Sequence, residues 1–158
     1  MRRRRLLSAT PIALAGLAIG HSRMAGAGQA AGVTETEIKI GNTAPYSGPV
    51  SPASVLAKAE AALFRMVNER GGVAGRRIVF ISLDDGFSPP KTFERTRRLV
   101  EDEGVAFMFS SIGTPTNSAV QRYLNDRKIP QLFVASGADK WATTSNSPER
   151  SATARATA

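Results

Sequence analysis

Small hydroxylated residues and a glycine form the segment whose types could do chemistry most directly, Ser110-Ser111-Ile112-Gly113-Thr114-Pro115-Thr116-Asn117. Gly113 lets a main chain approach a ligand closely, and Pro115 stands where a helix is expected to begin. N–H groups near Thr116 and Asn117 would then face an anion at the positive end of the helix dipole. The segment is typical of a carboxylate cradle, although Thr114 or Thr116 could instead cap its own helix.

A second small-residue segment, Ala135-Ser136-Gly137-Ala138, leaves space of the same kind after another expected strand. An ordinary turn between a strand and a helix would have the same composition. Both interpretations stay open from the residues alone.

The acidic pair Asp84-Asp85 raises two sharper possibilities, a magnesium site for phosphoryl transfer or a ribose-binding acid of a nucleotide fold. A receiver-like site needs further acids after other strands, and a dinucleotide fold needs a G-x-G-x-x-G loop, which Gly41-Asn42-Thr43-Ala44-Pro45 does not supply. The pair is therefore expected to cap a turn or a helix. His21, the one histidine, lies in an expected leader, so the mature chain has no imidazole for general-base catalysis.

The amino-acid composition excludes further classes of functional site. The 158 residues contain no cysteine, which excludes disulfides, thiolate zinc sites and a cysteine nucleophile. The net charge of +8 is uneven, because residues 1–27 hold five arginines and no acid. Basic and acidic side chains are nearly balanced in residues 28–158, so we expect no nucleic-acid partner.

Residues 1–27 have the layout of a signal peptide: an arginine run, an apolar stretch from Pro11 to Gly20, and Ala25-Gly26-Ala27 as a cleavage region. The apolar stretch is shorter than the roughly 20 residues of a membrane span. We therefore expect export to the periplasm, by a route that the sequence leaves open.

The elements that must position the two small-residue segments alternate along the chain. Strand-like runs are expected at 38–41, 78–83, 105–109 and 129–134, and amphipathic helices at 53–69, 92–103 and 115–126. Each parallel pairing needs a crossover, and right-handed crossovers place helices on both faces of the sheet. The expected fold is α/β with a doubly wound parallel sheet, in which ligands bind at the carboxyl ends of the strands.

The apolar spacing that indicates strands and helices ends at Trp141. Residues 142–158 contain no Val, Ile, Leu, Phe or Met, so this tail is expected to be disordered. We interpret it as the mark of a truncation or of a change in reading frame.

Several motifs occur in an order that resembles one protein family. They are Ile38-Lys39-Ile40-Gly41, Ser47-Gly48-Pro49, Val67-Asn68-Glu69-Arg70-Gly71-Gly72-Val73-Ala74-Gly75-Arg76-Arg77-Ile78, Leu83-Asp84-Asp85-Gly86-Phe87-Ser88-Pro89-Pro90-Lys91-Thr92 and Gly113-Thr114-Pro115-Thr116-Asn117. Together they resemble the amino-terminal part of periplasmic substrate-binding proteins of the branched-chain amino-acid type (the leucine/isoleucine/valine-binding family), which serve ABC importers.

This resemblance implies two α/β lobes that close on a small ligand, of which residues 33–141 would be the truncated first lobe. It implies an amino acid or small carboxylate as ligand, an ABC permease as partner, and neither cofactor, metal nor catalysis. The ligand-binding positions that it implies are Ser111, Gly113, Thr114, Ala135, Ser136 and Gly137. The alternatives are a ligand-sensing domain of a receptor and a Rossmann-like or receiver-like enzyme domain.

Overall fold

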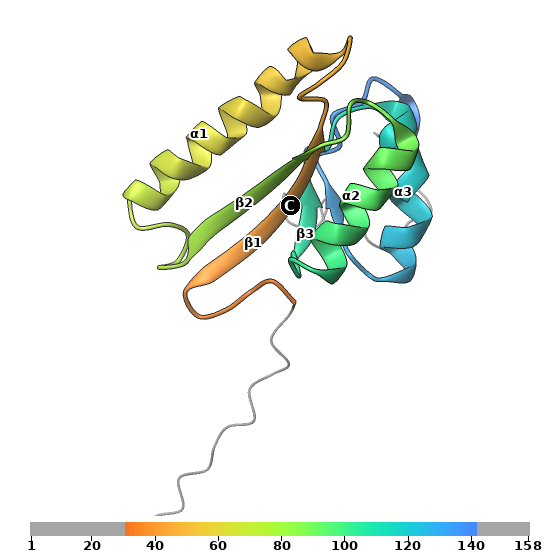
Figure 1. The fold of residues 1–158 in the computed structure, drawn as a ribbon. Helices are drawn as coiled ribbons and strands as arrows, with labels where there is room; N and C mark the ends of the chain where they lie inside the picture. The colour runs from red at the N-terminus through yellow and green to blue at the C-terminus, as the bar shows by residue number, and fades with distance from the viewer. Residues whose placement is uncertain (1–30, 142–158) are drawn as a thin grey trace, which may run out of the picture.

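Four segments of mainly extended backbone form one parallel sheet in the computed structural model, which describes residues 31–141 (Figure 1). The strands are β1 (Glu37–Ala44), β2 (Arg77–Asp84), β3 (Phe107–Phe109) and β4 (Gln131–Leu132), in the order β2-β1-β3-β4. All three pairings are parallel, with Ile40 of β1 aligned to Phe80 on one side and to Phe107 on the other. The doubly wound α/β fold expected from the sequence is confirmed.

Helices cover both faces of this sheet. The crossovers contain α1 (Val55–Glu69), which a 3-10 turn η1 (Ser51–Ser54) precedes, α2 (Pro89–Glu101) and α3 (Thr114–Asp126), and a second 3-10 turn, η2 (Asp139–Trp141), follows β4. Figure 1 shows α1 on one face and α2 with α3 on the other. Within residues 31–141 no helix is both long enough and apolar enough to cross a membrane.

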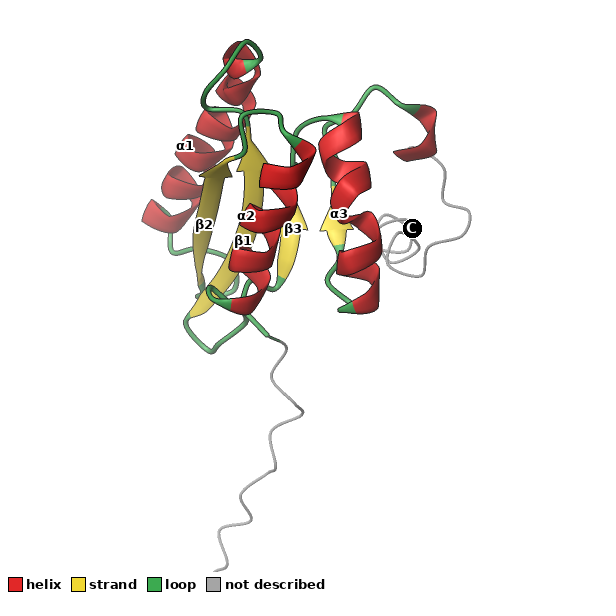
Figure 2. Cartoon of the chain, turned by 45° about the vertical axis from the view of Figure 1, so that its right-hand side comes forward, coloured by secondary structure: helices red, strands yellow, loops and turns green. Residues whose placement is uncertain are grey.

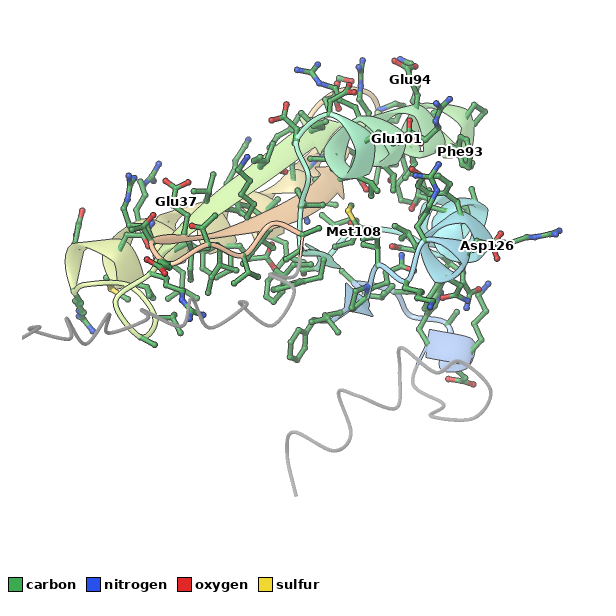
Figure 3. The ribbon with its side chains drawn as sticks, turned by 90° about the horizontal axis from the view of Figure 1, so that it is seen from below. Glu37, Phe93, Glu94, Glu101, Met108 and Asp126 are labelled. Carbon is green, nitrogen blue, oxygen red and sulfur yellow. The ribbon has the colours of Figure 1, made fainter. Side chains whose placement is uncertain are left out.

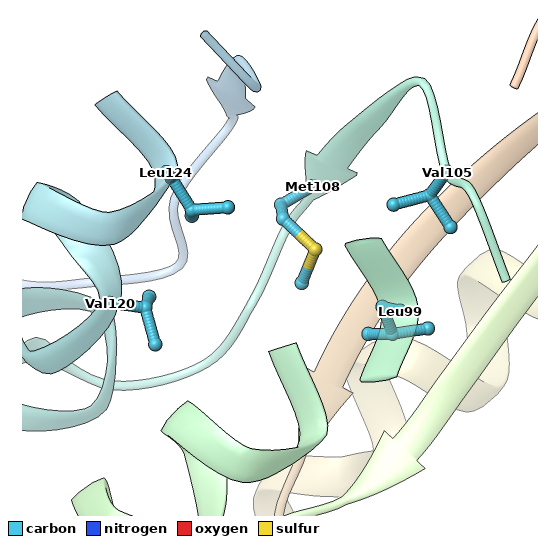
Figure 4. Packing of buried hydrophobic residues seen from close by; sticks show 5 residues of the cluster. All are labelled: Leu99, Val105, Met108, Val120 and Leu124. Atoms are coloured by element: carbon cyan, nitrogen blue, oxygen red, sulfur yellow. The ribbon is translucent and has the colours of Figure 1, made fainter. Parts of the chain in front are cut away.

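The main core lies between the sheet and the pair α2 and α3. Its fully buried side chains gather around the thioether of Met108 (Figure 4) and are Leu99, Val105, Met108, Val120 and Leu124. Gly41 of β1 faces this core, because a Cβ there would lie 2.9 Å from the Met108 sulfur. Burying each large side chain stabilises the fold by about 1.5–3 kcal/mol, so this cluster holds α2 and α3 on the sheet.

A smaller cluster lies at the carboxyl ends of the strands and supports the loops above it. Ala44, Ala57 and Ile112 form its buried centre, and Tyr46, Ala53, Phe87 and Ala135 pack against them. The loops that follow all four strands therefore rest on one apolar base.

A chain of hydrogen bonds crosses three strands near the same ends. The Tyr46 hydroxyl donates to Ser82 Oγ at 2.7 Å, and the Ser82 hydroxyl donates to Asn42 Oδ1 at 2.6 Å. The Asn42 amide in turn donates to the Phe109 carbonyl at 2.8 Å, and Asn42 is 0% exposed. Because buried polar groups are costly unless paired, this chain fixes the relative heights of β1, β2 and β3.

Two strands are shorter than the expected runs 105–109 and 129–134. Val105 packs in the main core before β3 begins, so its apolar character reflects that contact. Phe133 ends β4 because its φ of +52° leaves the extended region, and its side chain is 66% exposed.

The apolar stripe that the sequence spacing indicates on α1 is not the one that packs on the sheet. Leu56, Leu63 and Met66 belong to the apolar spacing that predicts an amphipathic helix over 53–69, yet they are 39%, 49% and 40% exposed. The sheet instead receives Ala57 and Phe64, whose ring lies 5.1 Å from the ring of Phe80 and 5.5 Å from the ring of Phe109. The helix is apolar on two stripes, and spacing alone does not choose between them.

The expected signal peptide (residues 1–27) and the expected tail (residues 142–158) lie outside the described residues.

Candidate functional site

Four loops leave the carboxyl edge of the sheet, where all strand arrowheads in Figure 2 point. Parallel pairing places these ends together, and the neighbouring order of β3 and β4 makes their loops adjacent. This edge therefore brings together the two small-residue segments that the sequence analysis singled out.

Main-chain hydrogen bonds join the third and fourth loops directly. The Gly113 N–H donates to the Ala135 carbonyl at 2.9 Å, and the Ala135 N–H donates to the Ser111 carbonyl at 3.1 Å. Ser111 is 3% exposed, and its hydroxyl accepts the Thr43 N–H at 3.2 Å. Ser111, Gly113 and Ala135 thus form a frame beneath the surface that fixes the loops.

Two predicted hydroxyl groups meet above this frame. Thr114 Oγ1 and Ser136 Oγ lie 2.7 Å apart, although the residues are 22 positions apart in the chain. Ser136 Oγ also accepts the Ala138 N–H at 3.1 Å. Since two hydroxyls share a single hydrogen in their mutual bond, one O–H remains to donate to a ligand.

Within the described part of the chain, no side chain caps the first turn of α3. Gly113 stands at the N-cap position with φ +108° and ψ +144°, where a side-chain oxygen is missing. The Thr116 hydroxyl donates back to the Ile112 carbonyl at 2.6 Å, and the Thr114 hydroxyl is paired with Ser136. Neither threonine caps the helix, so this alternative from the sequence is wrong.

Two main-chain donors therefore remain at this helix end. The Thr114 and Thr116 N–H groups donate to no other residue within 31–141, whereas the Asn117 N–H donates to the Gly113 carbonyl at 3.2 Å. Of the two expected donor regions, the Thr116 N–H is unpaired but belongs to a residue that is 0% exposed, and the Asn117 N–H is occupied, so Thr114 offers the accessible donor. Open N–H groups at a helix N-terminus attract an anion.

The side chain of Asn117 was not singled out from the sequence, yet it holds the turn in place. It is 0% exposed, and its amide donates to the Ser111 carbonyl at 2.8 Å and the Gly113 carbonyl at 2.6 Å. Gln131 of β4 donates to Asn117 Oδ1 at 2.6 Å. A polar residue on the inward face of an otherwise apolar helix stripe is the signal that could have found it.

A pocket of about 240 Å³ opens beside the fourth loop, lined by Val134, Ser136, Gly137, Ala138, Asp139 and Trp141. Its volume is below the roughly 300–1,000 Å³ of sites for drug-sized ligands, which suits a small molecule. Ser136 and Gly137 were predicted as ligand-binding positions. The indole of Trp141 lies on the wall of this pocket.

The first carboxylate of the acidic pair clamps the first two loops together. Asp84 Oδ1 accepts the Tyr46 and Ser47 N–H groups at 2.8 and 3.0 Å, and Asp84 Oδ2 accepts the Ser47 hydroxyl at 2.6 Å. The Ser47 hydroxyl and the main-chain N–H groups lower the pKa of Asp84.

The second carboxylate belongs to the start of α2. Asp85 is 0% exposed, and its two oxygens accept the Phe87 N–H and the Thr92 hydroxyl, both at 2.9 Å. Burial raises the pKa of Asp85. Within the described part of the chain no three acidic or imidazole side chains gather as metal ligands would. The pair therefore acts in turns and helix ends, as the sequence analysis expected.

Comparison with known proteins gives one family. The sequence profile described as "Periplasmic binding protein" matches residues 37–158. A search of curated protein sequences found no significant match.

Solved structures of similar fold include three that are described as solute-binding or amino-acid-binding proteins. A possible leucine/isoleucine/valine-binding protein from Rhodopirellula baltica SH 1 is 23% identical with a TM-score of 0.64, over 68% of this chain and 29% of that one. A fatty acid ABC transporter substrate-binding protein from Thermomonospora curvata is 28% identical with a TM-score of 0.58, over 70% and 27%. An ABC transporter solute-binding protein from R. palustris, in complex with benzoate, is 28% identical with a TM-score of 0.52, over 60% and 26%. The chain thus spans less than a third of the length of each.

Proposed function

Because this chain belongs to the periplasmic binding protein family, we propose that it is a solute-binding component of an ABC importer that binds a small carboxylate in the periplasm. Residues 33–141 would form the first lobe, an ABC permease would be the partner, and residues 1–27 would direct export. The binding step needs no cofactor and no covalent chemistry.

One observation carries this proposal: the paired hydroxyls of Thr114 and Ser136 lie beside the uncapped N-terminus of α3. A carboxylate there would accept the remaining O–H and the Thr114 N–H of the first helical turn. Charge-assisted hydrogen bonds of this kind are roughly twice as strong as neutral ones. No positively charged side chain is required, because the helix dipole and the N–H groups supply the complementary charge.

The six predicted positions divide by their surroundings. Thr114, Ser136 and Gly137 would contact the ligand, because they lie at the surface of the turn or in the adjacent pocket. Gly113 would shape the turn and would not contact the ligand, because the Phe87 ring and the Thr116 hydroxyl fill the space where its side chain would be. Ser111 and Ala135 would hold the two loops at the right separation through their mutual hydrogen bond.

The ligands named for relatives share one chemical group. The T. curvata protein is named for fatty acids, and the R. palustris protein is in complex with benzoate. A Streptococcus pneumoniae relative, 19% identical, is in complex with isoleucine. Each of these ligands carries a carboxyl group, which supports a carboxylate site here and leaves the body of the ligand open.

An enzyme of the receiver-like or nucleotide-binding type receives no support from the site. Such an activity would use Asp84 or Asp85, and both carboxylates already accept hydrogen bonds from loops and from the start of α2.

Isothermal titration calorimetry tests the proposal. We expect the purified chain to bind at least one of benzoate, octanoate and leucine. We expect Ser136→Ala to weaken that binding about 10-fold or more, as expected when a ligand loses a hydrogen bond to a charged group. Thr36→Ala removes an exposed hydroxyl at the opposite end of β1 and should leave the affinity unchanged. Failure of all three carboxylates to bind, or equal affinity of Ser136→Ala and the parent, would contradict the proposal.

A further inference from the structure

Phe87 adopts an unusual backbone conformation at the carboxyl edge of the sheet. Its φ of +60° lies in the left-handed region, which a bulky residue rarely occupies. The Asp85 carboxylate accepts the Phe87 N–H at 2.9 Å, and the Ser88 N–H donates to the Asp85 carbonyl at 3.0 Å. Asp85 is itself anchored by Thr92. The acidic pair thus holds the loop in a shape that fixes where the Phe87 ring lies.

The ring lies against the main chain of Gly113. A Cβ added to Gly113 would lie 2.5 Å from Phe87 Cε2, so the absence of a side chain there makes room for the ring. One side of the ring packs on the apolar base formed by Ala44, Ala57 and Ile112, and Phe87 is only partly buried. Because the ring contacts Gly113, the N-cap residue of α3, Phe87 stands beside the first turn of that helix.

The Gly113–Thr114 turn therefore lies between an apolar ring and a polar pair. The ring of Phe87 contacts Gly113 on the side of β1 and β2, and Ser136 contacts Thr114 on the side of β4. The acids nearest the ring are engaged, since Asp84 and Asp85 accept hydrogen bonds from main-chain N–H groups. This side of the turn therefore offers hydrogen-bond donors and an apolar surface, and the two carboxylates that precede Phe87 are already committed.

We propose that Phe87 is a specificity-determining residue, which selects a carboxylate whose carboxyl group is attached directly to a flat apolar body. The carboxylate would be held at Thr114 and Ser136, and the body would lie on the Phe87 ring in an offset or edge-to-face arrangement. This inference rests on the proposed function, because it names the class of ligand for that same site. The left-handed turn matters because it places the ring against the main chain before any ligand arrives, so that little ordering is needed on binding.

Fluorescence of Trp141 offers a direct test, since this residue is the only tryptophan in the chain and lines the adjacent pocket. The probes are benzoate, leucine and acetate, which share a carboxylate and differ in the attached group. The variants are Phe87→Ala, Phe87→Leu and the control Phe93→Ala. Phe93, labelled in Figure 3, is a partly exposed phenylalanine on α2. Its ring packs on the ring of Tyr123 in α3.

We expect the parent to bind benzoate more tightly than leucine or acetate. Phe87→Ala should weaken benzoate about 10-fold, the lower range for losing an apolar contact in a pocket, and change acetate by less than about two-fold. Phe93→Ala should leave all three affinities unchanged. Should Phe87→Ala fail to fold, as judged by circular dichroism, Phe87→Leu decides, because it keeps apolar volume and should still lose benzoate selectively.

The failures are distinguishable. If the parent binds leucine more tightly than benzoate, or if replacing Phe87 changes benzoate and acetate by the same factor, the role of Phe87 is overturned while the carboxylate site stands. If the parent binds none of the three probes, the proposed function fails as well.

Discussion

Replacing Gly113 by alanine is the sharpest test of the geometry at the α3 N-terminus, because two separate costs meet there. The backbone angles, φ +108° and ψ +144°, lie in a region that is nearly restricted to glycine, and a side chain there costs about 1–3 kcal/mol. The new Cβ would also lie 2.5 Å from Phe87 Cε2 and 2.6 Å from Thr116 Oγ1. Overpacking of this kind costs about 1–3 kcal/mol more. We expect Gly113→Ala to lower the free energy of unfolding by about 2–6 kcal/mol.

Two other glycines separate the contributions. Gly71 has a φ of +97° and no atom within 4 Å of an added Cβ, so Gly71→Ala should show the backbone cost alone, about 1–2 kcal/mol. Gly137 has neither a positive φ nor a neighbour within 4 Å, and Gly137→Ala should stay within about 0.5 kcal/mol of the parent. Urea denaturation at equilibrium, followed by far-ultraviolet circular dichroism, measures all three.

A double variant isolates the contact with Phe87. Removing the ring in Phe87→Ala should make Gly113→Ala less costly, with a coupling energy of about 1 kcal/mol. The reasoning is refuted if Gly113→Ala costs no more than Gly71→Ala, or if the two changes at 87 and 113 are simply additive.

The remaining predictions concern burial and charge. Burial holds the proton on Asp85 to a higher pH in the folded chain than in the unfolded one. The free energy of unfolding of the parent, relative to that of Asp85→Asn, should therefore fall as pH rises from about 4 toward neutrality. Urea titrations across that range would contradict this if the difference between the two free energies were constant. Burial also raises the pKa of Glu60, and among residues 31–141 its buried Oε2 has no hydrogen-bond partner, so Glu60→Met should stabilise the fold more at neutral pH than at about pH 4. Thermal unfolding at both pH values checks the order, and a larger gain in acid would refute it. Leu63→Lys on the exposed stripe of α1 should change stability by less than about 0.5 kcal/mol, whereas Phe64→Ala should cost about 3 kcal/mol; equal effects in urea denaturation would mean that α1 packs by the other stripe.

Local pattern was enough to predict the order of elements and the parallel sheet. Gly71-Gly72 and Gly104 end helices with positive φ angles, and Pro89-Pro90 begins α2, so these boundaries follow from residues whose backbone preferences are strong. The stripe of α1 that faces the sheet could not be predicted from the sequence, because both stripes of the helix are apolar. The length of β4 did not follow either, because the left-handed turn at Phe133 depends on contacts such as the one with the Phe109 ring at 5.5 Å.

The adjacency of the two small-residue loops was predictable from the sequence, and the contacts within them were not. Parallel strands oblige the loops at 113 and 136 to meet, and hydroxyl residues in both made the pairing of Thr114 with Ser136 foreseeable. The burial of Ser111 depends on its bond to the Thr43 main chain, across a strand pairing that spacing does not show. The role of Phe87 depends on the left-handed turn that Asp85 holds, and nothing in the sequence beside Gly86 indicates it.

Amide chemical-shift mapping in the presence of benzoate tests the central claim, a carboxylate bound where α3 begins, most directly. The largest perturbations in the ¹⁵N spectrum should fall on Thr114, Thr116, Ser136 and Gly137. Perturbations centred instead on the groove of about 250 Å³ between α1 and β2, lined by Phe64, Asn68 and Phe80 among others, would contradict it.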